Sequence, residues 1–237
     1  MSLESFSTGH FGFSATPLRD LGAAEYTLVT VVVDDSGSVN SKVRDMEQAL
    51  DKIVEACKLC PESDNLMIRV VKFNNRVTEV HGFKLLPDIQ SYNGVLGGHG
   101  LTALYEATLN SLVAMNAYGK TLSDQDYTVN GLLVVLTDGC NNINSATLAD
   151  IKREMEKSVS GEQIESLLSI LVGVDSGEAN LKSELQRMQV ECNFSQFEWM
   201  TDLSAKSLAR FAQFVSKSAS SQSKMIGTGS PSKSLTF

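Results

Sequence analysis

The stretch YTLVTVVVDDSGSVN, residues 26–40, constrains the fold of this chain more than any other. Its first part is a near-continuous apolar run, which is typical of a strand buried on both faces inside a parallel sheet. The run stops at DDSGS, residues 34–38, where two carboxylates and two hydroxyls follow one another at once. A strand that is apolar along its length therefore ends in a small group of charged and polar side chains.

Apolar strands and amphipathic helices alternate along the rest of the chain. Residues 66–73 and 76–86 are separated only by Asn74 and Asn75, which suffices for an antiparallel hairpin but not for a crossover helix. We expect further strands at 130–142, 165–175 and 194–200, and helices at 41–60, from near Thr102, at 145–161, 181–188 and 204–219. The pattern predicts an α/β, Rossmann-like fold: a central, mostly parallel six-stranded sheet with one antiparallel edge strand and helices on both faces.

The 237 residues divide into three parts by composition. Residues 1–24 have a mixed composition without a regular apolar pattern, which predicts an irregular N-terminal arm. Residues 25–219 carry the alternating strands and helices and form the expected domain. Residues 220–237 are rich in Ser and Lys, which predicts a flexible tail.

Charge and composition exclude several classes of function. The formal net charge of −8 argues against nucleic acid and against an anionic membrane as partners, because both attract basic surfaces. No apolar run reaches the roughly 18 residues of a membrane span, and the N-terminal sequence lacks the features of a secretory signal. Four cysteines are too sparse for a disulfide scaffold. We therefore expect a soluble, cytoplasmic protein with reduced thiols.

Polar side chains gather where the predicted parallel strands end, which is where open α/β sheets bind ligands. Asp34, Ser36 and Ser38 follow the first long strand, Thr102 lies in a Gly-rich loop, and Asp138 ends the strand LLVVLTD. Carboxylates and hydroxyls are hard oxygen ligands that suit Mg²⁺ or Mn²⁺, and Ca²⁺ fits less well. A cation between the two aspartates would also let both stay charged. These five residues are the predicted metal ligands.

The same residues carry a family resemblance. DDSGS has the D-x-S-x-S form of the metal-ion-dependent adhesion site of von Willebrand factor A domains, and GLTALYEA and VVLTDG resemble the segments that supply its threonine and second aspartate. The resemblance extends over about residues 25–219. It implies that the two serines and, in one state of the domain, the threonine bind the metal directly, and that the aspartates act wholly or partly through water. It also implies an open coordination position for a partner's carboxylate and, in some members, a shift of the last helix when that position is filled.

The resemblance is closest to stand-alone, intracellular A domains of bacteria. By analogy, these imply a non-enzymatic module that binds an Asp or Glu of a partner protein, within an AAA+ ATPase-linked system or one of the stress or tellurium-resistance type. One alternative is a Mg²⁺-dependent phosphohydrolase that uses Asp34 as nucleophile. Such enzymes, however, need an acidic residue at the position that Ser36 occupies in this chain. A scaffold with a vestigial metal site is another alternative.

Several residues have simpler interpretations. Asp and Ser also cap turns and helices, so Asp34, Ser36 and Ser38 taken alone would be compatible with a capped turn. Asp35 is expected to be a solvated carboxylate, and the alternative is that it tunes the metal site without binding the metal itself. Cys57 forms C-x-x-C with its neighbour three residues on, but both lie on the apolar face of a predicted helix and are expected to pack in the core.

Overall fold

The long apolar strand predicted from the sequence is β3 (Glu25–Asp34), and it lies in the middle of the sheet. The computed structural model describes residues 3–9, 11–161 and 164–225. The other strands are β1 (Glu4–Thr8), β2 (Phe11–Ala15), β4 (Leu66–Phe73), β5 (Val77–Leu85), β6 (Thr128–Thr137), β7 (Ser166–Val174) and β8 (Gln196–Met200). The α-helices are α1 (Val43–Lys58), α2 (Leu104–Ser123), α3 (Leu148–Ser160), α4 (Leu181–Glu191) and α5 (Ala205–Met225).

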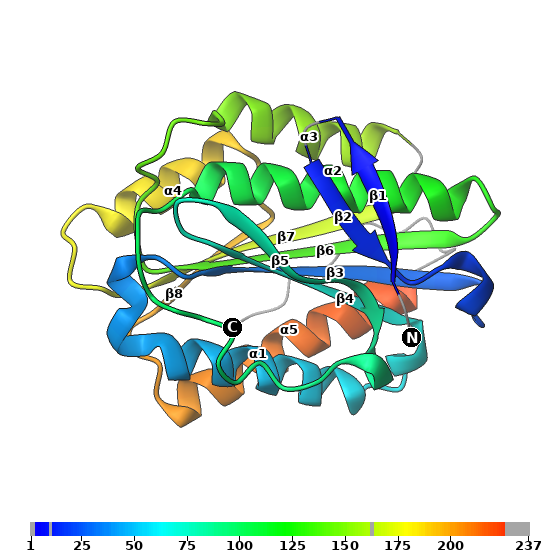
Figure 1. The fold of residues 1–237 in the computed structure, drawn as a ribbon, viewed down its shortest axis with the longest axis horizontal. Coiled ribbons are helices and arrows are strands. Elements are labelled where there is room, and N and C mark those ends of the chain that lie inside the picture. Colours follow the sequence, from blue (N-terminus) through cyan, green and yellow to red (C-terminus); the bar gives the residue numbers. More distant parts are fainter. Residues whose placement is uncertain (1–2, 10, 162–163, 226–237) are drawn as a thin grey trace.

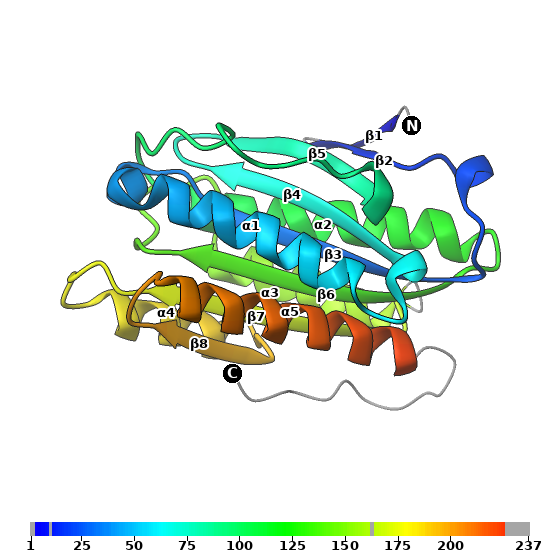
Figure 2. The same ribbon diagram turned by 90° about the horizontal axis from the view of Figure 1, so that it is seen from below.

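The strands form one sheet in the order β1-β2-β5-β4-β3-β6-β7-β8. Strands β4, β3, β6, β7 and β8 are parallel, and β5 pairs antiparallel with β4. Helices α2, α3 and α4 cover one face of the sheet, and α1 and α5 lie side by side on the other (Figures 1 and 2). The predicted fold class is therefore confirmed.

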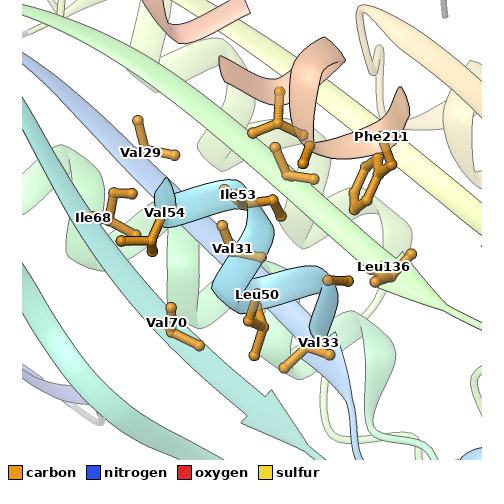
Figure 3. Close-up of a cluster of buried hydrophobic side chains, with 14 of the residues drawn as sticks. Val29, Val31, Val33, Leu50, Ile53, Val54, Ile68, Val70, Leu136 and Phe211 are labelled. Atoms are coloured by element: carbon orange, nitrogen blue, oxygen red, sulfur yellow. The ribbon is translucent and has the colours of Figure 1, made fainter. Parts of the chain in front are cut away.

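Alternate residues of β3 enter two separate hydrophobic clusters. Val29, Val31 and Val33 face α1 and α5, whereas Leu28 and Val32 face α2. Figure 3 shows the first of these clusters, in which Leu50, Ile53 and Val54 of α1 and Phe211 of α5 meet the valines of β3 and β4. Burying each such side chain contributes about 1.5–3 kcal/mol, so β3 is fixed from both sides.

The sheet has two more strands than the sequence analysis predicts. Residues 4–8 and 11–15, in a segment expected to be irregular, form the strands β1 and β2, which pair antiparallel, and Ala15 of β2 pairs with Phe83. Strand β5 is antiparallel as predicted, but it is not the edge of the sheet because β2 lies beside it. Gly82 permits this approach, since a Cβ there would lie 1.7 Å from the carbonyl oxygen of Ser14.

The last helix is longer than predicted. It continues to Met225 instead of ending near residue 219, because its C-terminal turns bond to the sheet. Ser223 shares a hydrogen bond of 2.8 Å with Thr27, and Asn130 donates to the carbonyl of Gln222 at 2.6 Å. The predicted tail of residues 220–237 thus begins within a helix, and its part from 226 onward lies outside the described residues.

Candidate metal centre

The candidate site lies between the carboxyl ends of β3 and β6. After β3 the chain turns to α1 on one face of the sheet, and after β6 it turns to α3 on the other. Neighbouring strands whose connections diverge in this way leave a crevice between them, which is the usual ligand position in such sheets. The site is at the left of Figure 1, where the chain leads into α1.

Asp34 forms the floor of the site. Its side chain is fully buried, and Oδ1 accepts the backbone N–H of Ser36 at 2.8 Å. Oδ2 accepts the hydroxyl of Thr137, the last residue of β6, at 2.5 Å. Burial raises the pKa of Asp34 to about 6, the two hydrogen-bond donors oppose this rise, and the charge of Asp138 adds to it. A cation near both carboxylates would relieve that cost.

The two serines connect Asp34 to the second predicted carboxylate. The hydroxyls of Ser36 and Ser38 lie 3.0 Å apart, and Ser38 donates to Oδ1 of Asp138 at 2.5 Å. Asp138 is also fully buried. The backbone at residues 37–42 winds as a short 3-10 helix, which turns both hydroxyls toward the end of β6.

Thr102 completes the group of five. Its side chain is almost fully buried, and it lines a cavity of about 250 Å³ together with Ser36 and Ser38. A Cβ at Gly139 would lie 3.4 Å from Ser38 Oγ and 3.5 Å from Thr102 Oγ1, so the glycine leaves space between those hydroxyls. The structure thus brings all five predicted residues to one place, and their binding of a metal stays a prediction.

The donor set fits a hard divalent cation. It consists of three hydroxyls that line one cavity and two buried carboxylates hydrogen-bonded to Ser36 and Ser38 behind it, and oxygen donors of this kind suit Mg²⁺ or Mn²⁺. In the described part of the chain, no three His, Cys, Asp or Glu side chains gather as a metal cluster. A cation here would therefore depend on serine and threonine hydroxyls as much as on charge.

Asp35 is not the solvated carboxylate that the sequence suggested. It is buried, and its Oδ1 accepts the backbone N–H groups of Gly97 and Gly98 at 2.5 and 2.8 Å. Lys72 Nζ lies 3.1 Å from Oδ2. Because the Gly-rich loop leads directly to Thr102, Asp35 holds the loop that carries a predicted ligand.

Asparagine side chains fix the rest of this loop, and the sequence analysis did not predict their contacts. Asn142 Oδ1 accepts the backbone N–H of Thr102 at 2.7 Å, and Asn75 Oδ1 accepts that of Leu101 at 2.7 Å. Gly100 adopts a φ of +91°, and a Cβ there would lie 2.0 Å from Asn75 Oδ1. The glycine is therefore needed for the close approach of the asparagine.

Lys42 is the most important side chain that sequence reasoning missed. Its Nζ lies 2.7 Å from Oδ2 of Asp138 and 3.2 Å from the carbonyl oxygen of Asp175, which follows β7. The hydrogen-bonded partners Lys42 and Asp138 are separated by 96 positions in the sequence. No local pattern distinguishes Lys42 from other lysines, so only the fold reveals its position.

The rim of the cavity is formed by Cys140, Asn142 and Glu178. Burial raises the pKa of the Cys140 thiol to about 11, and the negative charge of Glu178 adds to this rise. The thiol is therefore protonated near neutral pH and is a poor nucleophile. Cys57 is buried in the core as expected, whereas Cys60, three residues on, lies beyond the end of α1 and is only half-buried.

A mixed sheet between two layers of helices, with oxygen donors at its switch point, defines the class of doubly wound α/β domains that bind ligands at their strand ends. The family described as von Willebrand factor type A domain matches residues 29–209, and the chain belongs to this family. The domains of this family are typically binding modules that act through a metal-ion-dependent adhesion site, and they are usually non-catalytic. The comparison with curated proteins finds none that matches.

Solved structures with the same fold are distant in sequence. A D319A mutant of the PilB minor pilin from Streptococcus sanguinis is 12% identical, with a TM-score of 0.59, and the match covers 84% of this chain and 62% of that one. The pilus adhesin SpaC from Lactobacillus rhamnosus GG, in its open conformation, is 13% identical, with a TM-score of 0.60 and coverage of 93% and 34%.

A third match is proximal thread matrix protein 1 from the mussel byssus, with a zinc-occupied adhesion-site motif. It is 19% identical, with a TM-score of 0.50 and coverage of 81% of this chain and 46% of that one. At these identities the likenesses show the fold alone. This chain spans 62% or less of the length of the three proteins. Within the described residues, none of the helices has the length and apolar character needed to cross a bilayer.

Proposed function

We propose that this chain is a metal-dependent protein-binding module that performs no catalysis. Asp34, Ser36, Ser38, Thr102 and Asp138 hold Mg²⁺ or Mn²⁺, and a remaining coordination position takes the carboxylate of an Asp or Glu from a partner protein. The observation that carries the proposal is the gathering of five oxygen-donor side chains at the switch point of an A-domain sheet. Ser36, Ser38 and Thr102 line one cavity. Behind them, Asp34 accepts the backbone N–H of Ser36 and Asp138 accepts the hydroxyl of Ser38. A zinc-occupied motif in the mussel protein supports a divalent ion at the corresponding motif here.

The chemistry of the site supports binding over hydrolysis. Lys42 does lie in the site, where an ammonium group could hold a phosphate. However, Asp34, the candidate nucleophile, is fully buried and bonded to Ser36 and Thr137. The phosphorus atom of a substrate could not reach a carboxylate that is buried and hydrogen-bonded in this way. Turnover of a generic phosphatase substrate, lost in Asp34→Asn, would revive the enzyme alternative.

The cellular setting is part of the proposal. We place the protein in the cytoplasm of a bacterium, acting beside an AAA+ ATPase or in a stress or tellurium-resistance system, on the resemblance to stand-alone A domains. The net charge of −8 supports a protein partner over nucleic acid or an anionic membrane.

Calorimetric titration of Mg²⁺ and Mn²⁺ into metal-free protein tests the metal site. The wild type should bind one equivalent, and Asp138→Ala should lose measurable binding because a buried ligand is removed. Asp64→Ala is the matched control, since Asp64 is an exposed aspartate in the turn before β4, at the opposite edge of the sheet. Absence of binding by the wild type would refute the proposed metal site.

A peptide library displayed with Mn²⁺ and eluted with EDTA tests the ligand class. Every selected sequence should contain an Asp or Glu whose change to Asn or Gln abolishes binding. Selected peptides that bind equally well in EDTA, or that contain no acid, would contradict recognition through the metal.

A further inference from the structure

Asp138 has no free carboxylate oxygen in this structure. Oδ1 accepts the hydroxyl of Ser38 at 2.5 Å, and Oδ2 is paired with Lys42 Nζ at 2.7 Å. The Asp138 side chain is fully buried, whereas the Lys42 side chain is 23% exposed. A positive charge from the chain itself therefore already neutralises one of the two carboxylates that the proposed function assigns to the metal.

We infer that Lys42 is a built-in competitor of the divalent cation at Asp138. This inference rests on the proposed function. An ammonium group next to a divalent ion repels it strongly in a site that water screens only partly. Loading the metal therefore requires Lys42 Nζ to withdraw from Asp138. The flexible four-carbon stem and the partial exposure of Lys42 give the ammonium a route to solvent.

The same withdrawal affects the rim of the cavity. Lys42 Nζ also donates to the carbonyl oxygen of Asp175 at 3.2 Å, so it ties Asp138 to the connection between β7 and α4. That connection, residues 175–180, is exposed along its whole length, and its Glu178 lines the cavity. When Lys42 leaves Asp138, the connection loses a contact that holds it against the site. Metal loading and release of the rim are thus coupled through one side chain.

Calorimetry with Mn²⁺ on the wild type, Lys42→Met and Lys42→Arg tests the competition. Lys42→Met should bind about tenfold more tightly, the order of magnitude expected when one like charge beside a divalent ion is removed from a partly screened site. Lys42→Arg keeps the charge and should bind as the wild type does. Lys58→Met is the matched control, because it removes the same charge at the far end of α1, and its Kd should stay within about twofold.

Two further measurements do not depend on the size of the Kd. In EDTA, Lys42→Met should melt below the wild type because Asp138 loses its buried ion-pair partner, and saturating Mn²⁺ should remove that difference. In the wild type, the Lys42 amine should react faster with an acetylating reagent at saturating Mn²⁺ than in EDTA, as measured by peptide mass spectrometry.

The outcomes separate this inference from the proposed function. If the wild type and Lys42→Met both bind Mn²⁺ with equal Kd, or if the variant binds more weakly, Lys42 supports Asp138 or is neutral, and the competition is overturned. An unchanged reactivity of the Lys42 amine on metal loading overturns it as well. If the wild type itself binds no metal, the proposed function fails, and the inference fails with it.

Discussion

Replacing Asp35 by Ala tests whether this carboxylate holds the loop that carries Thr102. The change removes two hydrogen bonds from the backbone of Gly97 and Gly98, at 2.5 and 2.8 Å, to a buried carboxylate. Hydrogen bonds to charged groups contribute about 1.5–3 kcal/mol each, and the ion pair with the partly exposed Lys72 adds less than about 1 kcal/mol. We expect the free energy of unfolding to fall by about 3–6 kcal/mol.

Urea unfolding of the metal-free protein, followed by circular dichroism, measures this loss directly. Asp35→Asn is the matched control, because its amide oxygen can still accept the two backbone N–H groups without the charge, and it should lose about half as much. Calorimetry should also show weaker Mn²⁺ binding by Asp35→Ala, since the Thr102 loop is no longer held. A stability within about 0.5 kcal/mol of the wild type would refute the idea that Asp35 fixes this loop.

Three other expectations follow from the fold. Gly82→Ala should release the β1–β2 hairpin because its Cβ would lie 1.7 Å from the Ser14 carbonyl oxygen, and hydrogen exchange of residues 4–15 should rise; Gly12→Ala, with its nearest contact at 3.7 Å, should not have this effect. Burial lowers the pKa of His81 to about 4 from 6.5, so the unfolded chain binds this proton first, and the contribution of His81 to stability should fall as the pH drops from about 6.5 to 4. Asp34, with its pKa raised to about 6, contributes a slope of opposite sign, so the measurement is the difference in unfolding free energy between the wild type and His81→Phe. This difference should change by at most about 1.4 kcal/mol per pH unit, and a difference that does not change with pH would contradict the assignment. Phe211→Ala, in the cluster between α5 and β3, should cost about 3–5 kcal/mol in thermal or urea unfolding, and a loss below about 1 kcal/mol would mean that the cluster is loosely packed there.

The sequence by itself determined the class of the fold and the composition of the site. A strand buried on both faces appears in the sequence as a continuous apolar run, and a surface helix appears as apolar residues spaced three or four apart. Both patterns can be read locally, because the side chains that each element buries follow from its own geometry. The parallel order of β3 and β6 then places their carboxyl ends at one edge, so the polar groups at 34–38 and 138 had to lie near one another. The pairing of residues 4–8 with 11–15 was missed although part of its signal was present: Phe6 precedes a short Gly-containing link, and Phe11 and Phe13 alternate after it.

Tertiary structure alone decided which charged side chains meet in the site. Lys42 contacts Asp138 across 96 positions and Asp35 contacts the loop at Gly97 across 62, and neither pairing leaves a periodic or local trace in the sequence. The sequence gives no means of distinguishing Asp35 from its neighbour Asp34. In the structure, the Asp34 carboxylate lies on the floor of the site, whereas the Asp35 carboxylate points away from it and holds the Gly-rich loop. The reason is geometric: successive residues at a strand end point in opposite directions, and what each one meets depends on segments that the fold brings from elsewhere.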